Sequence, residues 1–384
     1  MIDRSGTSAE KVEGLKHIWG RTDLIPLWVA DMDFATAPFV TDAIRKRCEN
    51  EVLGYTGKPD SYYNAIINWV KQRYDLVVAK EMINFVPGIV PGIGMAMNCF
   101  TQKGDKVMIQ PPVYHPFAWV TTRNERTLVT NPLKWENGMY RMDLDTFREQ
   151  IKGCKLFILC NPHNPGGVVW TEAELRAIAD ICYDEKVLVF SDEIHADLTL
   201  PPHTHRPFAT VSEKARMNSV TFMSPSKAFN MPGLSASHAL IFNEDLRKRF
   251  RIYMDAGELD MGHVFAFLSV EAAYSHGTEW LDQCLAYIQG NIDFVDDFLK
   301  NHAPKIKAIR PEASYLVWLD CRELKLSQKD LNEFFVDKAH LALNDGEMFG
   351  KEGIGFMRLN VASPRCIIEK AMKQLADAYQ LYIK

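Results

Sequence analysis

The 384-residue chain lacks the features that would place it in a membrane, outside the cell or on a nucleic acid. No apolar run approaches the roughly 18 residues of a membrane span, and the N-terminus has no apolar signal region, so we expect a cytoplasmic protein. The 44 lysines and arginines against 49 aspartates and glutamates give a net charge of −5, with no basic block interleaved with aromatics. These absences argue against membrane and nucleic-acid partners and favour a small substrate.

Disulfide and metal-binding patterns are also missing. The eight cysteines are scattered, and none forms a Cys-x-x-Cys pair. Most of them lie in apolar runs, as reduced core thiols do. His203 and His205 follow two prolines, but no further ligands cluster nearby, so we expect a solvated loop there and no metal site.

The length and the hydrophobic content of 47% predict two domains with sizeable cores. From Ile83 onward, strand-like runs alternate with helical periodicity, which indicates an α/β fold with a mostly parallel sheet covered by helices on both faces. We expect a large domain over residues 46–285 and a smaller α/β domain over residues 286–384. Residues 1–45 should form an N-terminal segment that joins the small domain.

Lys227 is the first candidate for chemistry. It closes the sequence Ser224-Pro225-Ser226-Lys227, after an apolar strand-like run and before a Pro-Gly turn. An amine buried at such a sheet edge has a lowered pKa and becomes a nucleophile. The motif by itself leaves open the alternative of an ordinary solvated lysine.

Polar residues follow several of the other expected strands. Asn164, Asp192 and Tyr114 each lie in a loop after an apolar run. Residues 88–92 place free backbone amides at a helix N-terminus, an arrangement that can bind phosphate. In open α/β sheets the ligand lies beyond the carboxyl ends of the strands, so the convergence of these loops predicts a site there.

The order Asn164, Asp192, Lys227, Arg358 resembles the fold-type I pyridoxal-5′-phosphate (PLP) enzymes, the aspartate aminotransferase superfamily. The motifs Asn-Pro-His-Asn-Pro-Gly, Ser-Asp-Glu-Ile-His and Ser-Pro-Ser-Lys carry this resemblance, which covers essentially the whole chain. Four further segments look like the cystathionine β-lyase and cystalysin branch of carbon–sulfur lyases: 28–34, 54–57, 112–117 and 358–360. The resemblance implies the PLP-dependent transferase fold, with a seven-stranded sheet in the large domain.

The same resemblance implies the catalytic roles. Lys227 would carry PLP as a Schiff base and then act as the general base at the substrate Cα. Asp192 would keep the pyridine nitrogen protonated, which makes the ring an electron sink. Tyr114 would stack on the face of that ring.

It also implies the residues that bind cofactor and substrate. The cofactor phosphate would be held by amides and hydroxyls of Ile89, Val90, Ser224 and Ser226. Tyr55 would reach this phosphate from the neighbouring subunit of a homodimer with shared active sites. Asn164 would donate to the phenolic oxygen of PLP and contact the substrate. Arg358, assisted by the backbone around Ala30, would bind the carboxylate of an amino-acid substrate.

Ser235 stands where aminotransferases of this superfamily usually carry a phosphate-binding arginine, and the sulfur-lyase branch often lacks that arginine. We therefore expect β-elimination from cystathionine, cysteine or related S-substituted cysteines, which yields a thiol, pyruvate and ammonia. A class I/II aminotransferase is the first alternative, and a PLP-fold regulatory protein that acts through a protein partner is the second. His163 and His195 are expected to be hydrogen-bonded structural neighbours, and the role of His115 stays open.

Overall fold

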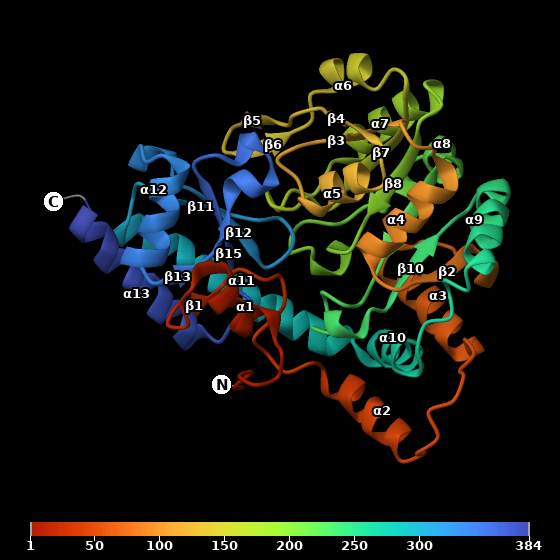
Figure 1. Cartoon of the computed structure of the whole chain (residues 1–384), viewed down its shortest axis with the longest axis horizontal. Helices are drawn as coiled ribbons and strands as arrows, with labels where there is room; N and C mark the ends of the chain where they lie inside the picture. The colour runs from red at the N-terminus through yellow and green to blue at the C-terminus, as the bar shows by residue number, and fades with distance from the viewer. Residues whose placement is uncertain (1, 383–384) are drawn as a thin grey trace.

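The computed structural model of the chain describes residues 2–382, and its largest sheet has seven strands. They lie in the order β2-β10-β9-β8-β7-β3-β4 (Figure 1). Their bounds are β2 (Ile83–Val86), β3 (Lys106–Ile109), β4 (Thr127–Thr130), β7 (Cys154–Cys160), β8 (Leu188–Asp192), β9 (Ser219–Met223) and β10 (Ser237–Leu240). β10 runs antiparallel to β2 and β9, and the other neighbouring pairs are parallel.

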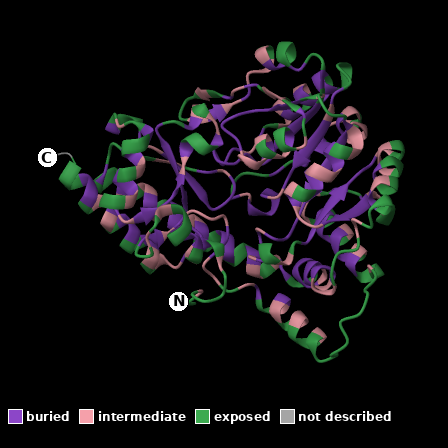
Figure 2. Cartoon of the chain, in the orientation of Figure 1, coloured by how far each residue is buried: buried purple, intermediate pink, exposed green. Residues whose placement is uncertain are grey.

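Helices cover both faces of this sheet (Figure 1). One face carries α4 (Ile89–Phe100), α5 (Pro116–Arg123) and α9 (Glu244–Ala256). The other carries α3 (Asp60–Tyr74), α6 (Leu144–Gln150), α7 (Glu172–Asp184), α8 (Glu213–Met217) and α10 (Val264–His276). On β7, Leu156 and Ile158 pack on the first face, whereas Phe157 and Leu159 pack on the second. This alternation leaves the inner strands buried on both sides, whereas the edge strand β4 is partly exposed (Figure 2).

A smaller antiparallel sheet is formed by the C-terminal part of the chain, in the order β11-β12-β15-β14. Its strands are β11 (Lys307–Ile309), β12 (Leu316–Asp320), β14 (Asn344–Asp345) and β15 (Phe356–Asn360), and the helices α12 (Gln328–Glu333) and α13 (Arg365–Tyr382) lie beside it. The predicted fold class, a mostly parallel seven-stranded sheet plus a smaller α/β unit, is confirmed. The exact domain bounds stay a prediction.

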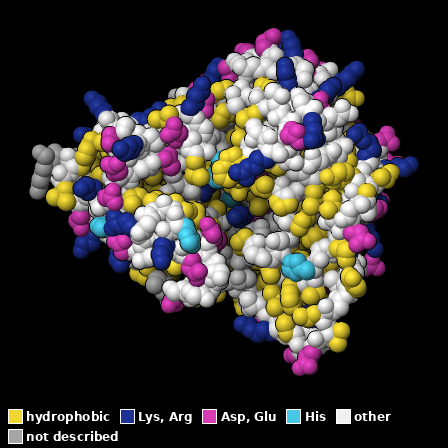
Figure 3. All heavy atoms as spheres, viewed as in Figure 1, with side chains coloured by type: hydrophobic (Ala, Val, Ile, Leu, Met, Phe, Trp, Pro, Cys, Tyr) yellow, Lys and Arg dark blue, Asp and Glu magenta, His cyan; other side chains and the backbone are white. Residues whose placement is uncertain are grey.

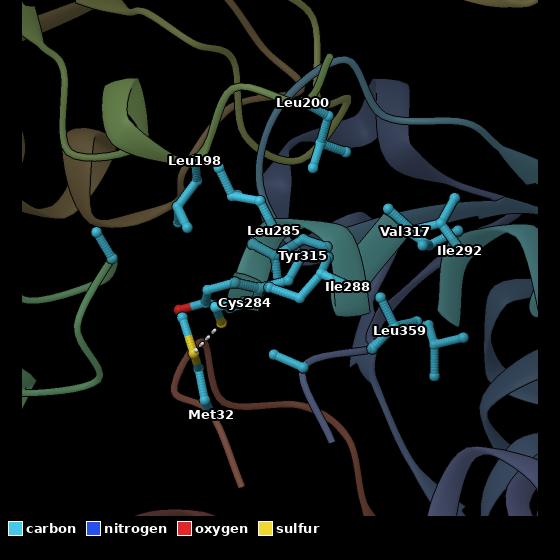
Figure 4. Close-up of a cluster of buried hydrophobic side chains, with 14 of the residues drawn as sticks. Met32, Leu198, Leu200, Cys284, Leu285, Ile288, Ile292, Tyr315, Val317 and Leu359 are labelled. Atoms are coloured by element: carbon cyan, nitrogen blue, oxygen red, sulfur yellow. Dashed lines mark hydrogen bonds between the residues drawn. The ribbon is translucent and has the colours of Figure 1, made fainter. Parts of the chain in front are cut away.

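The N-terminal segment packs against both sheets. It contains α1 (Glu10–Trp19), β1 (Ile25–Pro26) and α2 (Pro38–Cys48), and β1 pairs in parallel with β13 (Leu341–Ala342). Figure 4 shows Met32 of this segment against Cys284 of α11 (Thr278–His302), with their sulfur atoms 3.8 Å apart. Tyr315 and Leu359 of the smaller sheet region belong to the same buried cluster. The backbone around residue 30 is therefore fixed between the two sheets.

Residues 51–59, between α2 and α3, form no regular secondary structure and extend away from the body of the molecule (Figure 1). Three apolar side chains of this segment are exposed: Val52 by 72%, Leu53 by 62% and Tyr55 by 98%. A short hairpin of β5 (Lys134–Glu136) and β6 (Met139–Arg141) completes the strands. None of the helices within residues 2–382 combines the length and hydropathy needed to cross a membrane.

Candidate active site

A cavity of about 290 Å³ lies at the carboxyl ends of the central strands. It brings together most of the residues that the sequence predicted for the site: Ala30, Ile89, Val90, Tyr114, Asn164, Asp192, Ser226 and Lys227. Further wall residues were not predicted to bind a ligand: Pro87, Gly88, Pro91, Cys160, Ile194, His195, Pro232, Ser235, Ala236 and Ser237. The position is the one at which open α/β sheets bind ligands.

Lys227 lies on the turn that follows β9, and its half-buried side chain lines the cavity. Its Nζ donates a hydrogen bond to the carbonyl oxygen of Ala30 at 2.6 Å, and the hydroxyl of Tyr315 donates to the same oxygen at 3.0 Å. Burial lowers the pKa of the Lys227 amine to about 8, with the Arg358 cation acting in the same direction. A substantial share of this amine is therefore neutral and nucleophilic in weakly alkaline solution.

Both serines before Lys227 are buried, and their hydroxyl oxygens lie 2.9 Å apart, with Ser226 in the wall of the cavity. The hydroxyl of Ser224 donates to the carbonyl oxygen of Ala236 at 2.7 Å and accepts from the amide of Ser226 at 3.1 Å. The contact of Ser224 with the phosphate stays a prediction, and in this structure its hydroxyl shapes the turn before Lys227.

Asp192 ends β8, where it is paired with Cys160 of β7, and its carboxyl group is buried. The amide of Ile194 donates to its Oδ1 at 3.1 Å. Burial, reinforced by the neighbouring Glu193 carboxylate, raises the pKa of Asp192 to about 7. A cation placed against this carboxylate would favour its ionised form, which is the property required of a partner for a protonated ring nitrogen.

Arg358 lies on β15 of the smaller sheet, directly behind Asn164. Its Nη1 donates to Asn164 Oδ1 at 3.0 Å, and its Nη2 donates to the carbonyl oxygen of Trp28 at 3.1 Å and to Asn344 Oδ1 at 2.6 Å. These bonds use three of the five guanidinium N–H groups. The buried Nε has no acceptor within residues 2–382. Burial lowers the pKa of Arg358 to about 10, so the group keeps its positive charge at neutral pH.

The N-terminus of α4 forms another wall of the cavity. The helix begins at Ile89, so the amides of Ile89 and Val90 belong to its first turn, where backbone N–H groups have no partner inside the helix. Gly88 precedes them with φ of 114°, a conformation that favours glycine. A Cβ at Gly92 would lie 2.8 Å from the Val86 side chain, so the missing side chain lets the helix approach the sheet closely. The arrangement is suited to an anion.

Tyr114 and His115 follow β3 and take different places. Tyr114 lines the cavity, and burial raises the pKa of its phenol. His115 does not line it. The His115 ring packs against Trp119 and Phe349, with ring centroids 4.4 and 5.7 Å away, and burial lowers its pKa to about 4. We therefore assign His115 to the packing between α5 and the 346–355 loop.

The histidines differ from the sequence-based expectations. His205 is not in a solvated loop: it is buried, and its Nε2 lies 2.7 Å from Glu193 Oε2. The second oxygen of Glu193 accepts from Ser191 Oγ and the Phe208 amide, both at 2.8 Å, so the buried carboxylate is fully partnered. Within residues 2–382, no three or more histidine, cysteine or acidic side chains cluster as a metal site.

His163 and His195 differ in the hydrogen bonds of their side chains. His163 is hydrogen-bonded, as expected, through Nε2 to the carbonyl oxygen of Pro112 at 2.9 Å. His195 makes no side-chain hydrogen bond within the described part of the chain, and its Nδ1 is sealed from solvent. The expectation of a hydrogen-bonded structural histidine is thus wrong for His195, which is instead a wall residue of the cavity.

Asn230 is a site-shaping residue that sequence reasoning missed. It has a positive φ of 53°, and its side chain is bonded to three backbone atoms of the N-terminal segment: the Met32 amide at 2.9 Å, the Met32 oxygen at 3.0 Å and the Phe34 oxygen at 2.8 Å. These bonds hold Ala30 over Lys227. The sequence does offer a signal for this role. Asparagine tolerates the left-handed conformation, and Asn230 lies in the turn just after Lys227.

Comparisons with known proteins place this geometry in a family. The model of the family "Aminotransferase class I and II" matches residues 22–375. The cystathionine beta-lyase PatB of Bacillus subtilis (strain 168) is 37% identical over 378 residues, which cover 98% of each chain. The crystal structure of cystalysin from Treponema denticola, which contains a pyridoxal 5′-phosphate cofactor, superposes with a TM-score of 0.96 at 34% identity, over 100% of this chain and 98% of that one.

A second solved structure agrees with the first. The PLP-bound C–S lyase from Staphylococcus hominis matches with a TM-score of 0.91 at 35% identity, over 98% of this chain and 96% of that one. The family model and these relatives extend over nearly the whole chain, so the similarity includes both sheets and the residues that line the cavity. The chain belongs to the aminotransferase class I and II family.

Proposed function

We propose that this protein is a PLP-dependent carbon–sulfur β-lyase that acts on L-cystathionine, L-cysteine or related S-substituted cysteines. The observation that carries the proposal is the cavity in which the buried Lys227 amine, the buried Asp192 carboxyl and the helix N-terminus at Ile89 meet, with Ser235 in place of a phosphate-binding arginine. The relatives named as cystathionine β-lyase and C–S lyase support the sulfur chemistry.

The cavity residues fit PLP in their chemistry. Asp192 offers a carboxylate for a protonated pyridine nitrogen, and Lys227 offers an amine for the aldehyde. The first-turn amides of Ile89 and Val90, with the Ser226 hydroxyl, suit a phosphate. Tyr114 supplies an aromatic wall for the ring. Bound there, PLP supplies the electron sink that lets an amino acid lose its Cα proton and then a thiolate from Cβ.

The chain's own residues transfer the proton and bind the substrate carboxylate. Nζ of Lys227 removes the proton from the substrate Cα, and its pKa of about 8 places it close to the operating pH of a general base. Nη1 of Arg358 has one further N–H beside its bond to Asn164, and this charged donor would bind the substrate carboxylate next to Asn164. Ala30 also lines the cavity, and its backbone would assist in binding the same carboxylate. A thiolate leaves readily because its conjugate acid has a pKa of about 8.5.

The reaction type is tested with the purified, PLP-loaded protein and two substrates. With L-cystathionine we expect pyruvate and a thiol in equal amounts, and with L-alanine plus a 2-keto acid we expect amino transfer at least about 10² times slower. Pyruvate is measured by coupled reduction and the thiol with a chromogenic disulfide. Amino transfer in the second reaction without pyruvate in the first would make the protein an aminotransferase.

We infer further that the protein works as a homodimer with shared active sites. Tyr55 is 98% exposed, it is not a wall residue of its own chain's cavity, and it lies on the projecting 51–59 segment beside exposed Val52 and Leu53. Hydrophobic side chains also gather over the neighbouring α2 region (Figure 3). Exposed apolar surface of this kind favours burial against a second copy, in which Tyr55 would donate to the cofactor phosphate of the other subunit.

Mixing two inactive variants tests the sharing. Tyr55→Ala and Lys227→Ala, unfolded together in equal amounts and refolded, would form hybrids in which one of the two sites has both native residues. We expect activity to return to about one quarter of the wild-type value, because half of the dimers are hybrids with one native site each. The control variant is Tyr183→Ala, which removes an exposed tyrosine of α7. It should be active by itself, without mixing. Absence of recovery, with hybrids shown by mass, would contradict shared sites.

A further inference from the structure

A second cavity, of about 640 Å³, adjoins the cavity of the proposed active site. Ala30, Lys227 and Pro232 line both cavities, so the two meet at the Lys227 side chain. In an S-substituted cysteine the sulfur is only two bonds from Cα, where Lys227 would remove the proton. The substituent on that sulfur must therefore extend from a point close to Lys227, and the second cavity offers the space for it.

The walls of the second cavity combine apolar and charged side chains. Its apolar side chains come from the N-terminal segment, from α2 and from the turn after Lys227: Met32, Phe34, Ile44, Met231 and Leu234. Its charged side chains, apart from Lys227, all belong to the N-terminal segment: Arg4, Glu10, Asp31 and Asp33. The apolar part suits methylene groups and the charged part suits an ionised end, so the cavity matches a substituent that has both.

Arg4 has one edge of its guanidinium without a protein acceptor. Nη1 and Nη2 donate to the two carboxylate oxygens of Asp31 at 3.2 and 2.6 Å, and Nη1 also donates to Asp33 Oδ1 at 3.5 Å. No hydrogen bond within residues 2–382 uses the Nε–H or the second Nη2–H, and 26% of the side chain is exposed. These two N–H groups lie parallel on one edge of the planar guanidinium, where they can bind both oxygens of a carboxylate.

Arg4 is also held in place by opposite charges. The buried Lys11 amine lies 2.9 Å from Asp33 Oδ2 and 3.5 Å from Asp31 Oδ1, so two cations share two carboxylates. Asp31 follows Ala30, whose carbonyl oxygen accepts the hydrogen bond of Lys227 Nζ. Arg4 and Lys227 are thus anchored to neighbouring residues, which lets one ligand contact both.

We propose that the second cavity holds the S-substituent of the substrate and that the free edge of Arg4 binds a carboxylate at its far end. The preferred substrates are then cysteines whose S-substituent carries a distal carboxylate, as in L-cystathionine, rather than L-cysteine itself. This inference rests on the proposed lyase function, because it concerns the substrate of the same site.

The distal contact is tested by binding, without turnover. The ligands are 2,7-diaminosuberate, the carbon analogue of cystathionine, and 2,7-diaminoheptanoate, the same chain without the distal carboxylate. Neither has a thiolate to expel, and calorimetry with the PLP-loaded protein measures their dissociation constants. We expect loss of the carboxylate to weaken binding to the wild type about 20-fold, and to Arg4→Gln only about 2-fold, a coupling of about 10-fold.

Two further variants separate recognition from packing. Arg4→Lys keeps a cation that can pair with Asp31 but lacks the second parallel N–H, so its preference for the dicarboxylate should lie between those of the wild type and Arg4→Gln. Arg176→Gln, at an exposed arginine of α7 paired with Glu172, should keep the full preference.

The outcomes distinguish this inference from the lyase function. Equal preferences in the wild type and Arg4→Gln would overturn the inference, as would a wild type that does not distinguish the two ligands or binds neither. Pyruvate release from L-cystathionine without the Arg4-dependent preference would refute the distal contact alone. The preference without pyruvate release would refute only the lyase assignment.

Discussion

Lys227→Ala is expected to lower kcat/KM for β-elimination by a factor of about 10⁴ or more, because one change removes both the covalent attachment of the cofactor and the base at Cα. The Lys227 amine is bonded to the Ala30 oxygen and held at a pKa of about 8, and no other lysine is among the residues that line the cavity. Activity is measured by pyruvate release. Borohydride reduction followed by unfolding should leave cofactor covalently bound to the wild type and none to the variant.

Two controls separate chemistry from folding. Lys103→Ala, at an exposed surface lysine, should keep full activity and the reducible attachment. In Lys227→Ala, a small primary amine added to the assay should restore a measurable part of the rate, because it can take the proton that Nζ no longer removes. An alanine variant that keeps a tenth of the wild-type rate without added amine would show that Lys227 is not the base.

The residues that sequence alone could predict are those whose role depends on where a strand ends. Asp192 and Lys227 each follow a buried apolar run, and in a sheet such positions converge whatever the details of packing. The family resemblance then supplied the chemistry. The direction of each strand could not be predicted from the sequence. The sequence of β10 is typical of a strand, like its neighbours, yet β10 runs antiparallel to β2 and β9. A run of apolar residues does not specify the direction of the strand that it forms.

Side-chain orientation explains the predictions that were wrong. His203 and His205 are two positions apart: His203 remains partly exposed, whereas His205 reaches inward to Glu193. The deciding contact of His205 is with a carboxylate 12 positions away in the chain. Local composition carries no record of such contacts.

Arg358→Gln is expected to weaken the binding of an amino-acid substrate by a factor of about 10² to 10³, equivalent to about 3–4 kcal/mol, because it removes a buried charge-assisted pair. Glutamine removes the charge but keeps a polar amide behind the wall of the cavity. Affinities follow from the change in cofactor absorbance on titration. Arg358→Lys keeps the charge but lacks the planar guanidinium, so its substrate affinity should lie between those of the wild type and Arg358→Gln.

A comparison of ligands isolates the carboxylate from the rest of the site. L-alanine and ethylamine share the amine that reacts with the cofactor, and only L-alanine has the carboxylate that Arg358 would hold. In the wild type L-alanine should therefore bind more tightly, and in Arg358→Gln the two should become nearly equal because ethylamine loses nothing. Cofactor affinity should change by less than about 3-fold, since the guanidinium reaches the cavity through Asn164 and is not itself a wall residue. A preference for L-alanine that survives the substitution would place the carboxylate elsewhere, with the backbone around Ala30 as the remaining donor.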